Sequence, residues 1–253
     1  MTTPFGPQEQ GCLQGEGELL CGAEATKFRA LVARLNYLAP DRPDIQYATK
    51  EAAKRMGKPR RPDWQLLKRI GRYLLGHPRA VQLLEWQQSP AGLTTYVDSD
   101  WAGDKTSCKS TSGGMVFRGS HLLKSWSTNQ AVVALSSGEA ELYAQIKGAA
   151  QTLGLISMAA DFGEALQGTV YSDSVAALGI CTRVGLGKVR HIKVQYLWLQ
   201  EKITEGDLAV RKVAGEVNPA DLLTKGLGQE LLHRHLSFAG PKTWTGGGVL
   251  GEE

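Results

Sequence analysis

A long amphipathic helix with small residues at its centre is the sequence feature that most constrains the fold. Between about Gly138 and Phe162, apolar residues recur at alternating spacings of four and three positions, the period of one helix face: Leu142, Ile146, Ala149, Leu153, Ile156 and Ala160. Gly148, Ala149 and Ala150 allow a neighbouring backbone to come close. The pattern therefore predicts a helix whose apolar face lies directly against a sheet.

Short segments typical of β-strands lie on both sides of that helix. We expect strands at residues 94–98, 114–118, 122–126, 169–172 and 208–213, with a hairpin turn at Gly119-Ser120. A short helix, an amphipathic helix at about 192–204 and a last helix from Asn218 complete the pattern. This order predicts an α/β fold, a mixed five-stranded sheet flanked by helices.

The segment before the first strand has helical periodicity and is basic. Apolar residues between Phe28 and Tyr73 recur at helical spacing, and prolines at 40, 43, 59 and 62 divide the segment into helices. Residues 27–80 carry a net charge of +10, against −4 for residues 1–26 and −2 for residues 81–253. We expect a small all-helical module whose basic surface either follows a phosphate backbone or is simply solvated.

The composition of the two chain ends, the length of the apolar runs and the spacing of the cysteines predict which segments are flexible and where the chain is located. The Gly/Glu-rich residues 1–24 and the Gly-rich residues 240–253 predict a flexible leader and a flexible tail. The sequence contains no apolar run of about 18 residues, so no membrane partner is expected. The four cysteines form no CxxC pair, which favours a reducing, intracellular location.

Four acidic residues lie at the ends or edges of the expected elements: Asp98, Glu141, Asp173 and Asp221. Each has a structural explanation when considered alone. Asp98 and Asp100 share one strand face and could be solvent-exposed, and Asp173 could cap a helix. Asp221 follows Asn218-Pro219, where a carboxylate complements the helix dipole.

Glu139 and Glu141 have different predicted roles. Ser136 to Glu139 fits a capping box, with Ser136 as N-cap and Glu139 reaching back to its backbone N–H. Glu141 precedes Leu142 at the edge of the buried stripe, so its side chain can point toward the sheet. We therefore assign chemistry to Glu141.

Seven short motifs lie between residues 96 and 227: Tyr96–Asp104, Ser110–Gly114, Ser125–Trp126, Val133–Glu141, Tyr171–Ser174, Arg190–Ile192 and Asn218–Lys225. In order and spacing they resemble the ribonuclease H domain of copia-type retrotransposon polyproteins. Upstream, Phe28–Val32, Leu35–Ala39, Arg42–Ile45 and Leu67–Leu74 resemble the segment after the polymerase palm in the same polyproteins. The resemblance implies a reverse-transcriptase thumb/connection-like segment at 25–88 and a ribonuclease H-like domain at 92–232.

The resemblance also implies an activity, hydrolysis of the RNA strand of RNA/DNA hybrids during reverse transcription. Asp98, Glu141, Asp173 and Asp221 would be the catalytic residues and would bind two Mg²⁺ ions, for which Mn²⁺ can substitute. The cations would relieve the repulsion among clustered carboxylates. The implied partners are the hybrid and the polymerase domain of the parent polyprotein. The implied location is intracellular, in cytoplasmic virus-like particles, with the nucleus as an alternative.

Two sets of residues are candidates for nucleic-acid binding. Ser99, Asp100 and Ser174 lie where they could read the 2′-OH that distinguishes RNA from DNA. A basic group at the start of the penultimate helix could hold phosphates, or could be a solvated helix end: Lys188, Arg190, His191 and Lys193.

Alternatives to this function remain. The loop Ala214–Val217 lacks the histidine that some ribonucleases H have before the last helix. A serine separates Asp98 from Asp100, so the segment is no polymerase palm motif. The order Asp, Glu, Asp, Asp also differs from the Asp, Asp, Glu order of integrases. A non-catalytic, nucleic-acid-binding remnant of a retroelement polyprotein is the main alternative.

Overall fold

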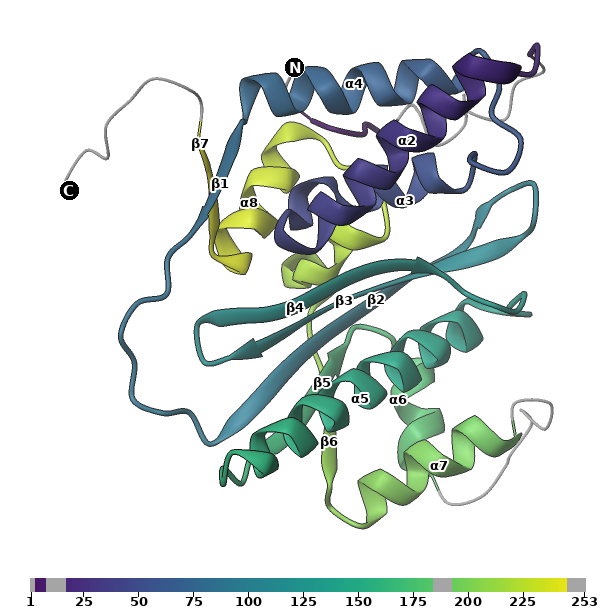
Figure 1. The fold of residues 1–253 in the computed structure, drawn as a ribbon. Helices are drawn as coiled ribbons and strands as arrows, with labels where there is room; N and C mark the ends of the chain where they lie inside the picture. The colour runs from purple at the N-terminus through teal and green to yellow at the C-terminus, as the bar shows by residue number, and fades with distance from the viewer. Residues whose placement is uncertain (1–2, 8–16, 184–192, 245–253) are drawn as a thin grey trace. The chain divides into compact units, whose positions relative to one another are not determined.

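The computed structural model describes residues 3–7, 17–183 and 193–244, except for the side chains of residues 193–196 and 241–244. Figure 1 shows its elements. The chain forms two compact units, which we call the helical unit (residues 1–83 and 225–253) and the sheet unit (residues 84–224). Within the described part of the chain, no helix has the length and apolar character needed to cross a membrane.

The sheet unit is built on a five-stranded mixed sheet. Its strands are β2 (Gly92–Asp104), β3 (Lys109–Arg118), β4 (His121–Asn129), β5 (Gln167–Ser172) and β6 (Leu208–Lys212). They lie in the order β4-β3-β2-β5-β6, in which the β2–β3 and β3–β4 pairs are antiparallel and the β2–β5 and β5–β6 pairs are parallel. Its helices are α5 (Ser137–Asp161), α6 (Val175–Thr182), α7 (Lys193–Thr204) and the 3-10 helices η3 (Gly215–Val217) and η4 (Pro219–Leu223). The predicted mixed five-stranded sheet flanked by helices is confirmed.

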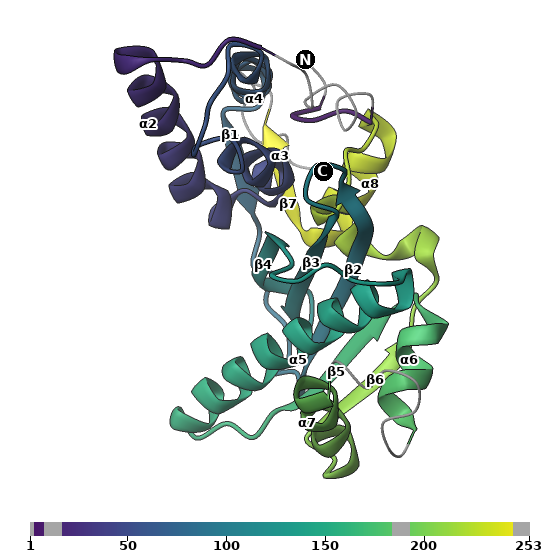
Figure 2. The ribbon, with the colours of Figure 1, turned by 90° about the vertical axis from the view of Figure 1, so that its right-hand side faces the viewer.

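The close packing of α5 on the sheet is confirmed too. A Cβ atom at Gly148 would lie 2.5 Å from Cγ1 of Val97 on β2, so only glycine permits this approach. One turn further on, the Thr152 hydroxyl is 2.6 Å from the Thr95 hydroxyl, so the pair is hydrogen-bonded. Figure 2 shows α5 running along the sheet. Burial fades after Thr152, and Ala160, expected in the buried stripe, is exposed.

The N-terminus of α5 has the predicted serine cap with one difference. The Ser136 hydroxyl accepts from the Glu139 N–H at 3.2 Å, as a capping box requires. The Glu139 carboxylate accepts from the Leu135 N–H at 3.0 Å instead of from Ser136. Glu139 is thus a structural residue, as predicted, but it reaches one position further than expected.

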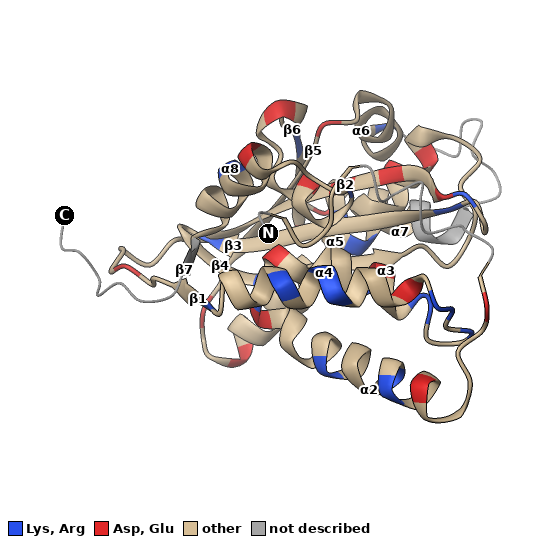
Figure 3. Ribbon diagram, turned by 90° about the horizontal axis from the view of Figure 1, so that it is seen from above, with Lys and Arg blue, Asp and Glu red and all other residues tan. Residues whose placement is uncertain are grey.

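The helical unit packs helices from both ends of the chain. It contains α2 (Gly22–Leu38), η1 (Ala39–Asp41), α3 (Pro43–Ala53), α4 (Asp63–Gly76) and α8 (Gln229–Ala239). Its core is apolar and includes Phe28, Val32 and Ile70, all completely buried. Figure 3 shows Lys and Arg along α2 and α4, where the exposed basic residues include Lys27, Arg34, Lys68 and Arg72. The predicted helical segment is therefore present.

Residues at both ends of the chain are more ordered than the sequence predicts. Pro241–Trp244, expected in the flexible tail, form β7, which pairs antiparallel with β1 (Arg79–Gln82). In the expected leader, Phe5 is buried with its ring edge against Tyr47, the ring centroids being 5.2 Å apart. The last helix expected from Asn218 is divided into η4 and α8, and α8 belongs to the helical unit. Single aromatic anchors and four-residue strands leave no periodic pattern to detect.

The motif Arg42–Ile45 has a structural role in the helical unit. The Arg42 guanidinium binds both carboxylate oxygens of the buried Asp44, at 2.9 and 2.7 Å. The Tyr73 hydroxyl donates to the same carboxylate at 2.9 Å. Burial and the Asp44 carboxylate both raise the pKa of Tyr73, so the hydroxyl stays protonated as a donor.

Candidate active site

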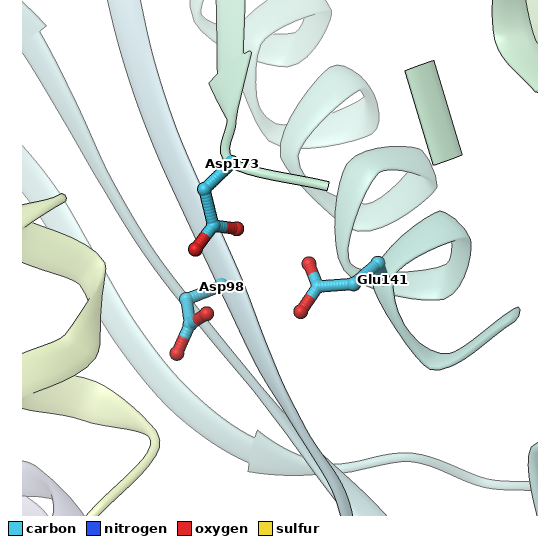
Figure 4. Close-up of side chains that lie close together, drawn as sticks. All are labelled: Asp98, Glu141 and Asp173. Atoms are coloured by element: carbon cyan, nitrogen blue, oxygen red, sulfur yellow. The ribbon is translucent and has the colours of Figure 1, made fainter. Parts of the chain in front are cut away.

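Three carboxylates from three separate elements meet at one end of the sheet. Asp98 lies on β2, Glu141 in the first turns of α5, and Asp173 directly after β5. One oxygen atom of each lies within 4.8 Å of the others. Figure 4 shows the three side chains pointing toward one another. Asp98 is only 3% exposed, and the other two are partly buried, so solvent does little to screen their mutual repulsion.

The sheet creates this meeting point because β2 and β5 separate there. Their parallel pairing ends at Tyr96 and Tyr171, just before the two aspartates. Beyond it, side chains take the place of a strand partner: Asn218 Nδ2 donates to the Val97 carbonyl at 2.9 Å, and the Ser99 N–H donates to Glu141 Oε1 at 3.2 Å. The backbone of β2 thus fixes the position of Glu141.

The structural explanations considered for the individual acids do not apply to these three. The N-cap of α6 is Ser174, whose hydroxyl accepts from the Ala177 N–H at 3.2 Å, so capping does not account for Asp173. Asp98 is buried and accepts from the hydroxyl of Thr224. Glu141, not Glu139, belongs to the cluster, as the edge position beside Leu142 predicted.

Asp221 lies on η4 and is not part of the 4.8 Å group formed by the described residues. The turn that carries it has the predicted start, with the Asn218 side chain accepting from the Ala220 N–H at 3.2 Å and Pro219 at the first position. η4 is a short 3-10 turn and not the beginning of a longer α-helix. A role for Asp221 as a metal ligand stays a prediction.

The predicted nucleic-acid contacts fall into two groups. Ser99 and Ser174 flank the carboxylates, while Asp100 accepts from the Thr111 N–H across the β2–β3 pair. A Cβ atom at Gly103 would lie 1.8 Å from Asp100 Oδ2, so the carboxylate lies beneath the bulge in β2. Lys188, Arg190 and His191 lie outside the described residues, and so does the side chain of Lys193 at the start of α7. All seven contacts stay predictions.

The polar residues of the Ser110–Gly114 motif shape the site, a role that the sequence did not reveal. The Ser110 hydroxyl accepts from the Ala102 N–H at 3.0 Å, where Ala102 has a positive φ of 51°. The Ser112 hydroxyl accepts from Gln130 Nε2 at 3.0 Å. Gln130 also donates to the Ala140 carbonyl at 2.8 Å, which ties the strand to the residue before Glu141.

The two glycines of the same motif make room for neighbouring groups. Gly113 lies opposite Asp98 in the β2–β3 register, and a Cβ atom there would lie 2.8 Å from both Leu223 Cβ and Thr224 Cγ2. At Gly114, a Cβ atom would lie 2.1 Å from Cζ2 of Trp126. The Ser110–Gly114 motif was part of the resemblance seen in the sequence, but the close contacts of its two glycines follow only from the fold.

The donor atoms of the cluster suit a hard divalent cation. All three side chains offer carboxylate oxygens, the ligands that Mg²⁺ and Mn²⁺ prefer, and neither histidine nor cysteine belongs to the group. Negative charges this close repel one another, and a bound cation would relieve that repulsion. The site therefore fits divalent-metal binding without specifying which ion.

Relatives of this chain are found among proteins of mobile elements. No protein-family model matches it. It is 32% identical over 243 residues, 95% of its length, to the retrovirus-related Pol polyprotein from transposon RE1 of Arabidopsis thaliana. It is 33% identical over 207 residues, 81% of its length, to the one from transposon RE2. These homologues are retrovirus-related Pol polyproteins of copia-type transposons. The resemblance to copia-type retrotransposon polyproteins, inferred from the motifs in the sequence, is thus confirmed.

The chain spans only a small part of these Pol polyproteins, 16% of the first and 14% of the second. Among solved structures, LC11-RNase H1, isolated from compost by a metagenomic approach, is 17% identical. The similarity covers 58% of this chain and 99% of that one, with a TM-score of 0.43.

Proposed function

We propose that this chain contains a metal-dependent ribonuclease H that hydrolyses the RNA strand of RNA/DNA hybrids. The observation that carries the proposal is the convergence of Asp98, Glu141 and Asp173 at the point where β2 and β5 separate. Homology to retrovirus-related Pol polyproteins supports the substrate, because reverse transcription produces such hybrids. The polymerase part of the same polyprotein is the proposed partner.

The carboxylates of Asp98, Glu141 and Asp173 would hold the cations, with Asp221 approaching from η4. Two bound Mg²⁺ or Mn²⁺ ions would supply an activated water and stabilise the leaving 3′ oxygen. The chain contributes rigidity: the Ser99 N–H fixes Glu141, and the Thr224 hydroxyl fixes Asp98. Ser99, Asp100 and Ser174 would contact the RNA strand at the site.

The basic residues before and at the start of α7 would hold phosphates of the hybrid: Lys188, Arg190, His191 and Lys193. We place the activity inside the cell, in cytoplasmic virus-like particles of an active element or in the nucleus. Fractionation of cells that express the intact element, followed by detection of this chain, tests the location.

The decisive experiment is cleavage of a 5′-labelled RNA annealed to DNA, with Mg²⁺ or Mn²⁺, beside single-stranded RNA and duplex DNA. We expect cutting of the hybrid alone, abolished by EDTA and by Asp98→Asn. Asp161→Asn is the matched control, because it makes the same change at the exposed end of α5. Both variants must retain the circular dichroism spectrum of the original chain.

The alternative, a non-catalytic remnant, predicts a different result. A folded chain that binds hybrid but does not cut it, even with the polymerase part of the polyprotein restored, would contradict the enzymatic proposal. Equal cutting of an all-DNA duplex would contradict the assigned substrate.

A further inference from the structure

Thr224, which was not among the predicted site residues, contacts the carboxylate cluster through Asp98. It follows η4 directly, is 0% exposed, and its hydroxyl donates to Asp98 Oδ2. Asp98 comes from a strand 126 positions earlier, so only the fold brings the two together. A hydroxyl buried against a carboxylate fixes the rotation of that carboxylate, and with it the direction of both oxygens.

Several contacts hold Thr224 in this position. Gly113, the register partner of Asp98, lets Leu223 and Thr224 approach the sheet to a distance that a Cβ atom would forbid. The Ser127 hydroxyl on β4 donates to the Leu223 carbonyl at 2.6 Å. The Thr224 N–H donates to the Asp221 carbonyl at 3.3 Å. The turn is therefore fixed to β3 and β4 immediately beside Asp98.

We infer that Thr224 is a positioning residue, which orients the Asp98 carboxylate toward Glu141 and Asp173 and so preorganises the cation site. The inference rests on the proposed function for its purpose, but cation binding itself is measured separately from catalysis. Groups that orient metal ligands commonly change metal affinity or activity about 10- to 100-fold when they are removed. The same turn also carries Asp221, so its position affects two of the predicted ligands.

Three variants of the intact chain separate orientation from simple packing. Thr224→Val removes the hydroxyl and keeps the branched shape, whereas Thr224→Ser keeps the hydroxyl and removes the methyl group. Thr204→Val is the control, because Thr204 is exposed at the end of α7. Mn²⁺ affinity is measured by isothermal titration calorimetry without nucleic acid, and thermal unfolding is recorded without metal.

The expected result is a loss of Mn²⁺ affinity of about 10- to 100-fold in Thr224→Val. Thr224→Ser and Thr204→Val should stay within about threefold of the original chain. In hybrid cleavage, Thr224→Val should lower kcat at saturating hybrid and leave KM for the hybrid nearly unchanged. If Thr224→Val does not fold, Thr224→Ala removes the same hydroxyl without adding a methyl group and carries the same expectation.

Two results would overturn the inference. One is unchanged Mn²⁺ affinity in a folded variant without the hydroxyl, and the other is an equal loss in Thr224→Ser, which would assign the effect to packing. The failure of the proposed function looks different: the original chain would bind Mn²⁺ with the predicted dependence on Thr224 but would not cut hybrid.

Discussion

Gly148 and Gly154 lie on the same helix in different surroundings, and replacing each with alanine should change stability in opposite directions. A Cβ atom at Gly148 would lie 2.5 Å from Val97 Cγ1 and 3.5 Å from Thr95 Cγ2. At Gly154, the same atom would meet nothing within 4 Å. Gly154→Ala should therefore stabilise the protein by about 0.5–1 kcal/mol, through the lower conformational entropy of alanine in the unfolded chain.

Gly148→Ala gains the same contribution but forces a methyl group into occupied space. Overpacking of this kind costs about 1–3 kcal/mol. Because the helix-propensity gain is common to both variants, the difference between them isolates the packing cost. We expect Gly148→Ala to unfold at a urea midpoint about 1 M below that of Gly154→Ala, taking typical slopes of 1–3 kcal/mol per M.

The same substitution should affect the active site. The inserted methyl group pushes α5 away from β2, and these elements carry Glu141 and Asp98. The hydrogen bond from Ser99 to Glu141 would lengthen beyond its present 3.2 Å. Hybrid cleavage by Gly148→Ala should therefore fall, while that by Gly154→Ala stays unchanged. Equal stability and equal cleavage of the two variants would refute the close approach of helix and strand.

Other perturbations give further expected outcomes. Gly215→Ala should lower hybrid cleavage with little change in thermal stability, because its Cβ atom would lie 3.0 Å from Asp173 Oδ2; unchanged cleavage would contradict this. Burial alone would raise the pKa of Glu51, but the ammonium groups of two neighbouring lysines lower it below its ordinary 4.5. A carboxyl group whose pKa is lower in the folded than in the unfolded state stabilises the fold at pH values above the unfolded pKa. This stabilisation is lost as the pH falls through the folded-state pKa. In urea titrations, the free energy of unfolding of the original chain should therefore exceed that of Glu51→Gln at pH 7, and the difference should vanish below about pH 4.5.

Local patterns made much of the sheet unit predictable. Helical periodicity and small residues identified α5 and its contact with a sheet, and the turn at Gly119 has the positive φ of 59° that glycine accommodates. The choice of Glu141 over Glu139 followed from the capping box and from the position of Glu141 beside Leu142, at the edge of the buried stripe. These features depend on neighbours within a few positions, so the sequence displays them directly.

Long-range contacts were not predictable in the same way. β1 and β7 pair over four residues each and join segments about 160 positions apart along the chain. The resemblance identified the acids but not the groups that hold them. No periodicity indicates that Asn218 replaces a strand partner at Val97, or that Gly113 admits a turn from far downstream.

The segment from Asn218 to Thr224 shows why the support of the site is hard to see in sequence. Asn218 both caps η4 and satisfies the backbone of β2 beside Asp98, and Thr224 bonds to the Asp98 carboxylate. This short turn therefore has two roles. It supplies a hydrogen-bond donor to the edge of β2 where β2 and β5 separate, and it orients the carboxylate of Asp98 on the same strand. Because the same turn carries Asp221, a change that displaces the turn would alter the cluster and its predicted fourth acid together, which links the stability of the turn to the proposed metal binding.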